Sequence, residues 1–213
     1  ELLRGESSEW DTPDFSFRAT PPRIASGHRP PFYFGGLSPD ARDVAARMAD
    51  VYLMWPDTTP AVEEIIRDMR ARAQAYGRTL RFGYRVHVIV RETEAEAREH
   101  AEYLVAALDD EIGRAIRARS LDATSVGVAR QSELRDGADE DGYAEPHLWT
   151  GIGRARSGCG AAIVGSAEQV IEKIQSYQRL GIEAFIFSGY PHREECRYVG
   201  ELVLPHLTHA PLY

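Results

Sequence analysis

The chain has 213 residues, of which 27% are charged and 43% are hydrophobic, and its formal net charge is −8. A chain of this size and composition can bury the core of one globular domain. The negative charge argues against nucleic acid or an anionic membrane surface as a partner, and no apolar run approaches the ~18 residues that span a bilayer. Only two cysteines are present, which argues against a disulfide framework and favours a cytoplasmic location.

Residues 1–31 contain turn formers and a proline cluster, and we expect an extended arm with one short hairpin. No secretory signal opens the chain. It begins at Glu1 without an initiator methionine, so we expect a longer polypeptide. From Phe32 onward, short apolar runs alternate with helical patterns. Strands are predicted at 32–34, 51–55, 81–90, 161–164 and 184–187, each followed by a helix, with the helices starting near 39, 60, 94, 167 and 192.

Several helix starts carry capping residues. The predicted caps are Ser38 and Thr59, each before a proline, and the capping-box pairs Thr93 with Glu96 and Ser166 with Gln169. The apolar stripes of the helices, together with Tyr103 and Tyr177, are predicted to lie in the core. In the last helix, Cys196 is expected on the inner face.

The regular alternation stops between residues 113 and 160, which are rich in Arg, Gly, Ser and Asp. An aperiodic insertion of this length predicts either a functional lid or a disordered linker. Arg156 lies among glycines there, which suits closure over an anionic substrate. Cys159 has no activating base nearby in the sequence and is interpreted as a passive residue. The histidines lack metal-ligand spacing, so no metal site is predicted.

The predicted strand at 81–90 is apolar on one face and carries Gly83, Arg85, His87 and Ile89 on the other. A parallel strand buried on both sides should be apolar on both faces. The guanidinium and the imidazole therefore indicate chemistry, since they could bind an anion or stabilise a developing negative charge. The alternative is an edge strand with one solvated face.

Unusual residues also occur where the first two strands end. Gly35, Gly36 and Ser38 form a glycine-rich turn at a helix N-terminus, a natural seat for a phosphate group. The alternative is a tight turn followed by an ordinary N-cap. Trp55 could form the wall of a site for a flat ligand, or it could pack in the core.

The last strand leads into Tyr190 and His192, which could donate or relay protons. Alternatively, they are the polar tips of a Gly-Pro turn. In parallel α/β folds, reacting groups gather at these carboxyl ends of strands. Four main strand–helix units are visible, with strands near 32, 51, 81 and 184, and the segment at 161–164 is an extra. A closed (β/α)8 barrel needs eight such units. We therefore expect an α/β fold that forms half of such a barrel.

Five motifs together resemble the C-terminal half of the alkanesulfonate monooxygenases, which belong to the bacterial luciferase-like, reduced-flavin-dependent enzymes. The motifs are FYFGGLS at 32–38, VYLMW at 51–55, RFGYRVHVIVRET at 81–93, GCGAAIVG at 158–165 and SGYPH at 188–192. Their order and spacing match over nearly the whole chain, from the arm at 1–31 onward. The resemblance implies that residues 1–213 are the C-terminal half of one luciferase-like TIM-barrel domain, with 113–160 as its lid.

The resemblance also implies a function. Reduced FMN, delivered by a separate NAD(P)H-dependent flavin reductase, would react with O2 and cleave the C–S bond of an alkanesulfonate to give an aldehyde and sulfite. By motif position, Ser38 would contact the FMN phosphate. Arg85 and His87 would lie beside the flavin and the sulfonate, and Arg156 would close from the lid. Tyr190 would assist proton transfer, with His192 next to it.

Other interpretations remain open from the sequence. The protein could be another luciferase-like oxidoreductase that uses a flavin or a deazaflavin, or a non-catalytic flavin-binding half-barrel. The first four strand–helix units lie outside this sequence, so residues 1–213 alone are expected to be inactive. The resemblance further implies a homo-oligomer.

Overall fold

The computed structural model describes residues 5–20, 30–119, 124–154 and 158–210. It divides into two units, residues 1–32 and 33–213. The first unit contains an antiparallel hairpin of β1 (Ser8–Asp11) and β2 (Ser16–Ala19), in which Trp10 lies opposite Phe17. The short hairpin predicted within residues 1–31 is therefore present.

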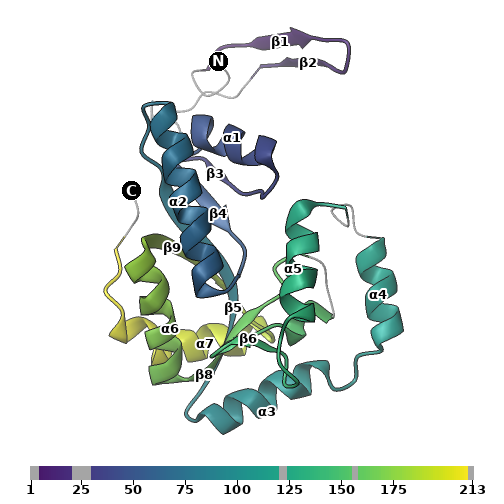
Figure 1. The fold of residues 1–213 in the computed structure, drawn as a ribbon, viewed down its shortest axis with the longest axis vertical. Coiled ribbons are helices and arrows are strands. Elements are labelled where there is room, and N and C mark those ends of the chain that lie inside the picture. The colour runs from purple at the N-terminus through teal and green to yellow at the C-terminus, as the bar shows by residue number, and fades with distance from the viewer. Residues whose placement is uncertain (1–4, 21–29, 120–123, 155–157, 211–213) are drawn as a thin grey trace. The chain divides into compact units, whose positions relative to one another are not determined.

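A curled sheet with β5 at its centre organises the second unit (Figure 1). Its strands are β3 (Tyr33–Phe34), β4 (Val51–Met54), β5 (Arg81–Arg91), β6 (Tyr143–Glu145), β7 (Leu148–Trp149), β8 (Ala162–Ser166) and β9 (Ile182–Ser188). β3, β4 and β5 are parallel neighbours, and β9 runs parallel to β5. β8 pairs with the last residues of β5, and the β6–β7 hairpin adds to β8 in antiparallel fashion. The predicted α/β class is confirmed, with a mixed rather than wholly parallel sheet.

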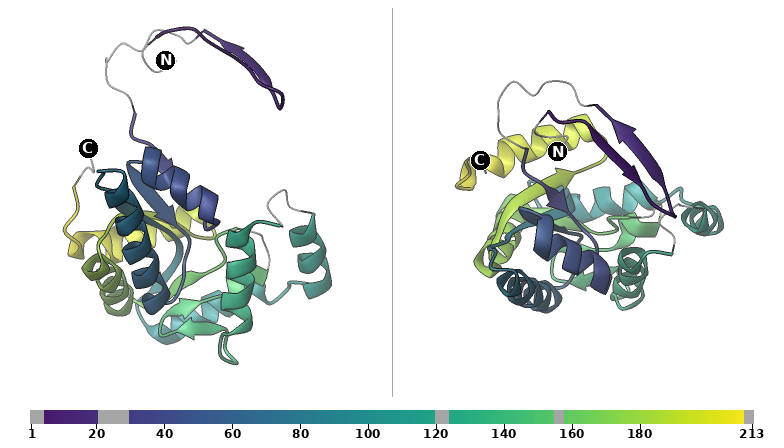
Figure 2. Two further views of the ribbon diagram at one scale, coloured as in Figure 1. Left: turned by 45° about the horizontal axis from the view of Figure 1, so that its top comes forward. Right: turned by 90° about the horizontal axis from the view of Figure 1, so that it is seen from above.

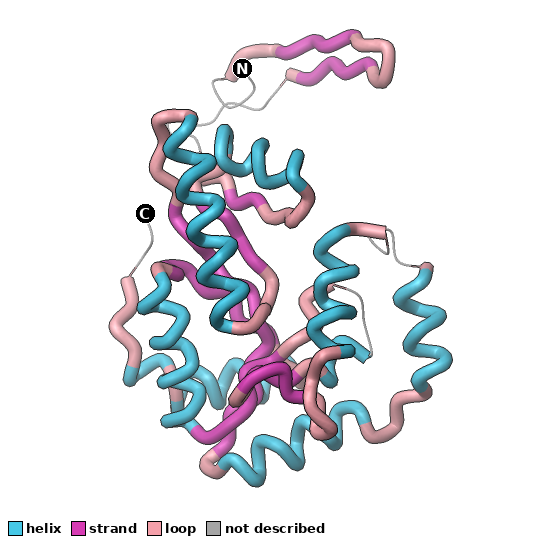
Figure 3. The backbone as a smooth tube through the Cα atoms, in the orientation of Figure 1, coloured by secondary structure: helices cyan, strands magenta, loops and turns pink. Residues whose placement is uncertain are grey.

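Helices pack against these strands (Figures 2 and 3). They are α1 (Pro39–Met48), α2 (Thr59–Ala75), α3 (Glu94–Val105), α6 (Ala167–Leu180) and α7 (His192–Leu202), which is followed by the 3-10 turn η3 (Leu204–His206). Each follows one of the five predicted strands, so the expected alternation is confirmed. Within the described residues, no helix is both long enough and apolar enough to cross a membrane.

One face of the sheet is covered by helices. On this face Tyr52, Phe82, Tyr84 and Val86 pack in one cluster with apolar side chains of α1, α2, α6 and α7. All four side chains are almost fully buried. This is the apolar face that the alternating pattern of residues 81–90 predicts.

The opposite face is only partly covered. Tyr33 and Ile186 are each 41% exposed, and Leu53 and Arg85 are half-buried. The register places Arg85 next to Ile186 across β5 and β9. We call the face that carries these four residues the open face. The alternative of an edge strand is wrong, because β5 pairs with β4, β8 and β9.

The predicted helix caps are confirmed with one shift. The Ser38 hydroxyl accepts a hydrogen bond from the Ala41 amide, and both predicted capping boxes form, at the starts of α3 and α6. The N-cap of α2 is Thr58 rather than Thr59, so the proline at position 60 is the second helical residue. A proline is tolerated there because amides of the first turn have no partner within the helix.

The interpretation of residues 113–160 as a stretch without regular elements is wrong for the described part. It contains the end of α4 (Asp110–Ala118), α5 (Val126–Asp136), β6, β7 and the 3-10 turn η2 (Gly151–Arg154). The period was hidden because α5 buries a polar residue, Gln131, together with Leu134. The role of this segment as a lid stays a prediction.

Two predictions of buried residues are also wrong. Tyr103 is 74% exposed on α3, and Cys196 is exposed on α7. The neighbouring residue Glu195 is buried instead. Tyr177 is fully buried, as expected. The apolar pattern of a helix therefore predicted its buried face only to within about one residue. The pattern does not show which polar side chains have buried partners.

The two glycines of α6 and α7 should respond oppositely to alanine. Gly200 lies within α7 with no atom near an added Cβ, so Gly200→Ala should stabilise the fold by about 0.5–1 kcal/mol. Gly181 ends α6 at φ +107°, and an added Cβ would lie 2.5 Å from Arg70 Nη2. Gly181→Ala should therefore destabilise by about 1–2 kcal/mol. Urea unfolding of both variants checks this, and equal midpoints would contradict it.

Candidate active site

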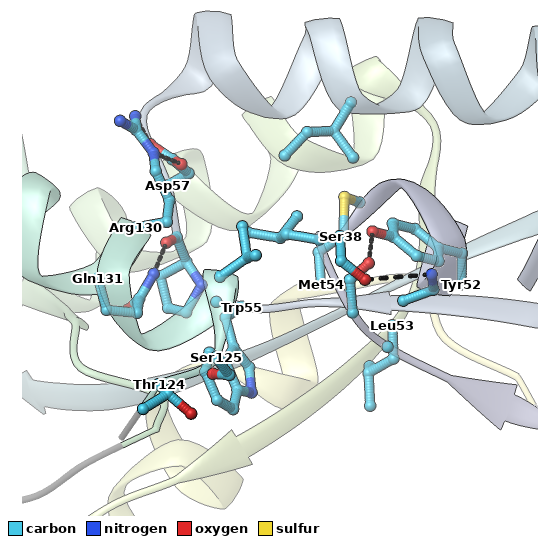
Figure 4. A pocket seen from close by; sticks show the side chains of 18 residues that line it. Ser38, Tyr52, Leu53, Met54, Trp55, Asp57, Thr124, Ser125, Arg130 and Gln131 are labelled. Atoms are coloured by element: carbon cyan, nitrogen blue, oxygen red, sulfur yellow. Dashed lines mark hydrogen bonds and ion pairs between the residues drawn. The ribbon is translucent and has the colours of Figure 1, made fainter. Parts of the chain in front are cut away.

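A pocket of about 530 Å³ lies where β3 and β4 end (Figure 4). It is lined by residues 35–38, 52–57 and 124–127, with Ala41, Ile65, Arg130 and Gln131. Its volume is within the range of small-molecule sites. Sequence reasoning placed the cofactor at Gly35, Gly36, Ser38 and Trp55, and the structure brings all four to this pocket.

The glycine turn at one end of the pocket is held tightly. A Cβ on Gly35 would lie 2.6 Å from the Leu53 carbonyl oxygen, and a Cβ on Gly36 would lie 2.7 Å from the Ala41 Cβ. The Tyr52 hydroxyl donates to the Gly36 carbonyl at 2.6 Å. Burial raises the pKa of Tyr52, so this donor stays protonated. The turn thus sets the N-terminus of α1 at the pocket, where a helix attracts anions.

Trp55 forms part of the pocket wall beneath the start of α5. A Cβ on Gly127 would lie 3.2 Å from the indole ring, so the backbone of α5 lies close to that ring. Figure 4 shows Ser125 beside the same indole. The tryptophan is half-buried, which leaves part of its surface available to a flat ligand.

The pocket also contains three residues that sequence reasoning missed. Asp57, 2% exposed, accepts two hydrogen bonds from Arg130, at 2.6 and 2.8 Å. This pairing raises the pKa of Arg130. Gln131 donates to the Pro56 carbonyl at 2.7 Å and accepts from the Gly160 amide at 3.0 Å. Helix α5 is therefore fixed to the loop after β4.

Two tyrosines support that loop from the core side. The hydroxyls of Tyr84 and Tyr177 each lie 3.4 Å from the Asp57 carbonyl oxygen, within reach of a hydrogen bond. Burial raises the pKa of both phenols, so they remain donors. Glu145 on β6 accepts from Tyr177, from Lys173 at 2.6 Å and from the Thr59 amide at 2.9 Å. The β6–β7 hairpin is therefore also attached to the helices.

The predicted catalytic residues form a second group further along β5. His87 is 1% exposed, and its ring stacks on Tyr190 with centroids 5.6 Å apart. The Tyr190 ring meets His192 edge-on at 4.9 Å. The Cys159 thiol lies 3.7 Å from His87 Nδ1 and donates to the Arg85 carbonyl at 3.3 Å. The His87 imidazole therefore lies beside the Cys159 thiol, although no base is close to Cys159 in the sequence.

The structure joins three of the five predicted catalytic residues and leaves two apart from them. His87, Tyr190 and His192 are in contact. Arg85 lies on the open face, where its guanidinium makes no ion pair with any described residue. Arg156 falls outside the described residues. None of the four described residues lines the pocket at Trp55.

The two groups are adjacent in the sheet. Met54 pairs with Tyr84, so Trp55 and Arg85 follow the last recorded pair of β4 and β5. Alternation along β5 places the Arg85 side chain on the open face, whereas Trp55 follows the last residue of β4. The arrangement offers a helix N-terminus, an aromatic wall, a guanidinium and an imidazole–phenol pair at one end of the sheet. These groups can bind an anionic cofactor, bind an anionic substrate and transfer protons.

Comparison with known proteins identifies the class. The model of the luciferase-like monooxygenase family matches residues 1–184, and the chain belongs to this family. It is 61% identical over 213 residues to a sulfoquinovose monooxygenase from Novosphingobium aromaticivorans. This alignment covers 99% of this chain and 59% of that protein. It is 54% identical over 183 residues to a sulfoquinovose monooxygenase from Agrobacterium fabrum, covering 86% of this chain and 48% of that protein.

Solved structures support the fold. A riboflavin lyase crystallised with modified FMN and riboflavin superimposes with a TM-score of 0.67 at 17% identity, over 94% of this chain and 48% of that one. Identity at this level shows the fold alone. The chain spans about half the length of the two sulfoquinovose monooxygenases that it matches. The resemblance to luciferase-like enzymes is confirmed, whereas the alkanesulfonate monooxygenases in particular are not singled out.

Proposed function

We propose that the chain is part of a flavin-dependent monooxygenase that cleaves the C–S bond of an organosulfonate, with a sugar sulfonate as the preferred substrate. One observation carries this proposal: Arg85 and His87 share one face of β5, and the neighbouring strand β4 ends at a pocket with a helix N-terminus and an indole wall. The two curated relatives are named for sulfoquinovose, a sugar sulfonate. An alkanesulfonate is the second candidate.

Reduced FMN fits the pocket at Ser38 and Trp55. A phosphate would accept hydrogen bonds from backbone amides at the N-terminus of α1. The isoalloxazine would lie against the Trp55 indole. Close packing at Gly35 and Gly36 brings the backbone itself to the ligand. The bound flavin would supply two electrons to O2, and a separate NAD(P)H-dependent reductase would supply the reduced flavin.

The residues of β5 suit the substrate. A sulfonate stays anionic at any physiological pH, so a permanently charged guanidinium is a suitable partner, and Arg85 offers one. Tyr190 and His87 can hold and move a proton at the reacting carbon. In the overall reaction the C–S bond breaks and sulfite leaves. One oxygen atom of O2 becomes the aldehyde oxygen, and the other becomes water with the flavin's electrons.

The open face also enters the proposal. Ile186 is exposed beside the half-buried Arg85, and Tyr33 is exposed on the same face of the sheet. We infer that further strand–helix units cover this face and close a (β/α)8 barrel, of which residues 1–213 are the C-terminal half. Four parallel strands in the order β3, β4, β5 and β9 agree with this. The same proposal has four further parts. Residues 113–160 form a lid, residues 1–31 form an arm, the protein is a homo-oligomer, and it is located in the cytoplasm.

The test uses the full-length protein that contains this chain. Purified protein, FMN, a flavin reductase, NADH and O2 are mixed with sulfoquinovose or with a series of alkanesulfonates, and sulfite is measured. We expect sulfite release from sulfoquinovose, with a higher kcat/KM than for any of the alkanesulfonates. Release from alkanesulfonates alone would shift the substrate to the second candidate. No sulfite from any sulfonate would reject the proposal.

The cofactor is tested separately by titrating reduced FMN and a reduced deazaflavin and following fluorescence. Tighter binding of the deazaflavin would favour a different luciferase-like oxidoreductase. Binding of FMN with hydrogen peroxide as the only product would favour a non-catalytic flavin-binding role. Neither result is expected, because Arg85 and His87 share one face of β5 and the His87 ring stacks on Tyr190.

A further inference from the structure

A buried ion pair lies directly behind the proposed proton-transfer residues. Glu195, in the first turns of α7, is 2% exposed. Its carboxylate accepts two hydrogen bonds from Arg91 at the end of β5, at 2.6 and 3.2 Å. Arg91 also donates to the Val90 carbonyl at 2.7 Å, and its guanidinium lies over the Tyr198 ring at 4.4 Å. The carboxylate is thus held in one orientation.

His100 links this carboxylate to the loop before α7. Its Nε2 lies 3.5 Å from Glu195 Oε1 and 3.3 Å from the Tyr190 carbonyl oxygen. Both neighbours are acceptors, so this ring nitrogen carries a hydrogen, whether the ring is neutral or protonated. The imidazole of α3 therefore ties the backbone of Tyr190 to the buried pair.

The backbone on the other side of Tyr190 also rests on Glu195. A Cβ on Gly189 would lie 2.4 Å from the Glu195 Cβ and 2.6 Å from its Cγ. It would also lie 3.2 Å from the Val88 carbonyl oxygen of β5. The loop is therefore packed between β5 and the Glu195 side chain, and only a residue without a side chain fits at this position.

We propose that Glu195 is a positioning residue for the reaction, which acts with Arg91 and His100 to hold Tyr190 against His87. This inference rests on the proposed function. Three elements meet at this carboxylate: the end of β5, α3 and α7. Replacing a buried ion pair by apolar packing is often neutral or stabilising, so stability alone does not account for it. What the pair provides here is a fixed geometry for the stacked rings, 5.6 Å apart and inclined at 24°.

The activity test compares Glu195→Gln with Glu194→Gln in the full-length protein. The amide keeps the size of Glu195 but loses its charge, while Glu194 is the exposed neighbour on the same turn. Glu195→Gln should lower kcat about 10- to 100-fold, with KM for the sulfonate changed less than about two-fold, because misplacement of a reacting group affects chemistry more than binding. Glu194→Gln should behave as the wild type.

A double variant separates positioning from general structure. Tyr190→Phe removes the proton-transferring hydroxyl that Glu195 is proposed to hold in place. In that background Glu195→Gln should lose most of its effect on kcat, because the two residues share one pathway. Full additivity of the two losses would overturn the proposal, as would a wild-type kcat for Glu195→Gln.

A second readout needs no turnover. The ring protons of His87, assigned by their loss in His87→Gln, feel the ring current of Tyr190 in NMR spectra. Glu195→Gln should shift them towards their positions in Tyr190→Ala, and unchanged signals would overturn the proposal. If Glu195→Gln does not fold, His100→Gln takes its place, since His100 is partly exposed. A wild type that releases no sulfite would reject the proposed function while leaving this test intact.

Discussion

Replacing Arg85 by alanine in the full-length protein should lower kcat/KM for the sulfonate by roughly 30- to 5,000-fold. Arg85 is half-buried on the open face, and its guanidinium has no carboxylate partner among the described residues. Removing one member of a desolvated, hydrogen-bonded charge pair costs about 2–5 kcal/mol, which corresponds to this range. Sulfite release under subsaturating substrate measures it.

The matched control is Arg81→Ala, on the same strand and the same face. Arg81 pairs with Glu183 at 2.9 Å, and both side chains are a third or more exposed. Its loss should cost at most about 1 kcal/mol of stability and leave kcat/KM within two-fold. Arg85→Lys should retain part of the activity, because lysine keeps the charge but not the forked donors. Equal activities of Arg85→Ala and Arg81→Ala would contradict the assignment of the sulfonate to Arg85.

The strands and helices of the second unit could be predicted where local signals are strong. Residues 81–90 alternate regularly, and β5 spans 81–91. Capping boxes at Thr93 and Ser166 mark the helix starts because the reciprocal bonds form between residues three apart. Local chemistry of this kind is visible in a sequence without knowledge of the fold.

The insertion could not be predicted in the same way. Helix α5 is held by Asp57, Pro56 and Gly160 through Arg130 and Gln131, and these partners lie about 30 to 75 residues away. Gln131 is buried because it bonds to two of these distant partners, but a hydropathy pattern predicts that a glutamine is exposed to solvent. The same holds for Glu195, whose partner Arg91 is 104 residues distant.

The candidate site was predictable in its parts but not in its arrangement. The glycine turn and Trp55 do line one pocket, and His87 does contact Tyr190. Cys159 meets His87 only because β8 pairs with the end of β5. Pairing between strands 70 or more residues apart depends on the register of the whole sheet, for which a single sequence holds no direct signal.

Replacing Asp57 by alanine should destabilise the fold by about 1–3 kcal/mol and weaken flavin binding. The loss of a buried partner usually costs about 3–5 kcal/mol, but the Arg130 side chain is 36% exposed and can be rehydrated, which reduces the cost. The Thr58 amide loses its acceptor on Asp57 as well, at the start of α2. Urea unfolding at constant m-value gives the free energy, and fluorescence titration gives the flavin affinity.

The control variant removes Glu133, the other carboxylate that pairs with Arg130. Glu133 pairs with Arg130 at 3.1 Å but is two-thirds exposed, so Glu133→Ala should change stability by less than about 0.5 kcal/mol. Asp57→Asn keeps an acceptor for Thr58 and should fall between the two. If Asp57 only stabilises the core, flavin affinity will be unchanged at temperatures where the variant is folded. If it fixes α5 over Trp55, affinity will fall together with protection of α5 from proteolysis, because the helix then separates from the pocket wall.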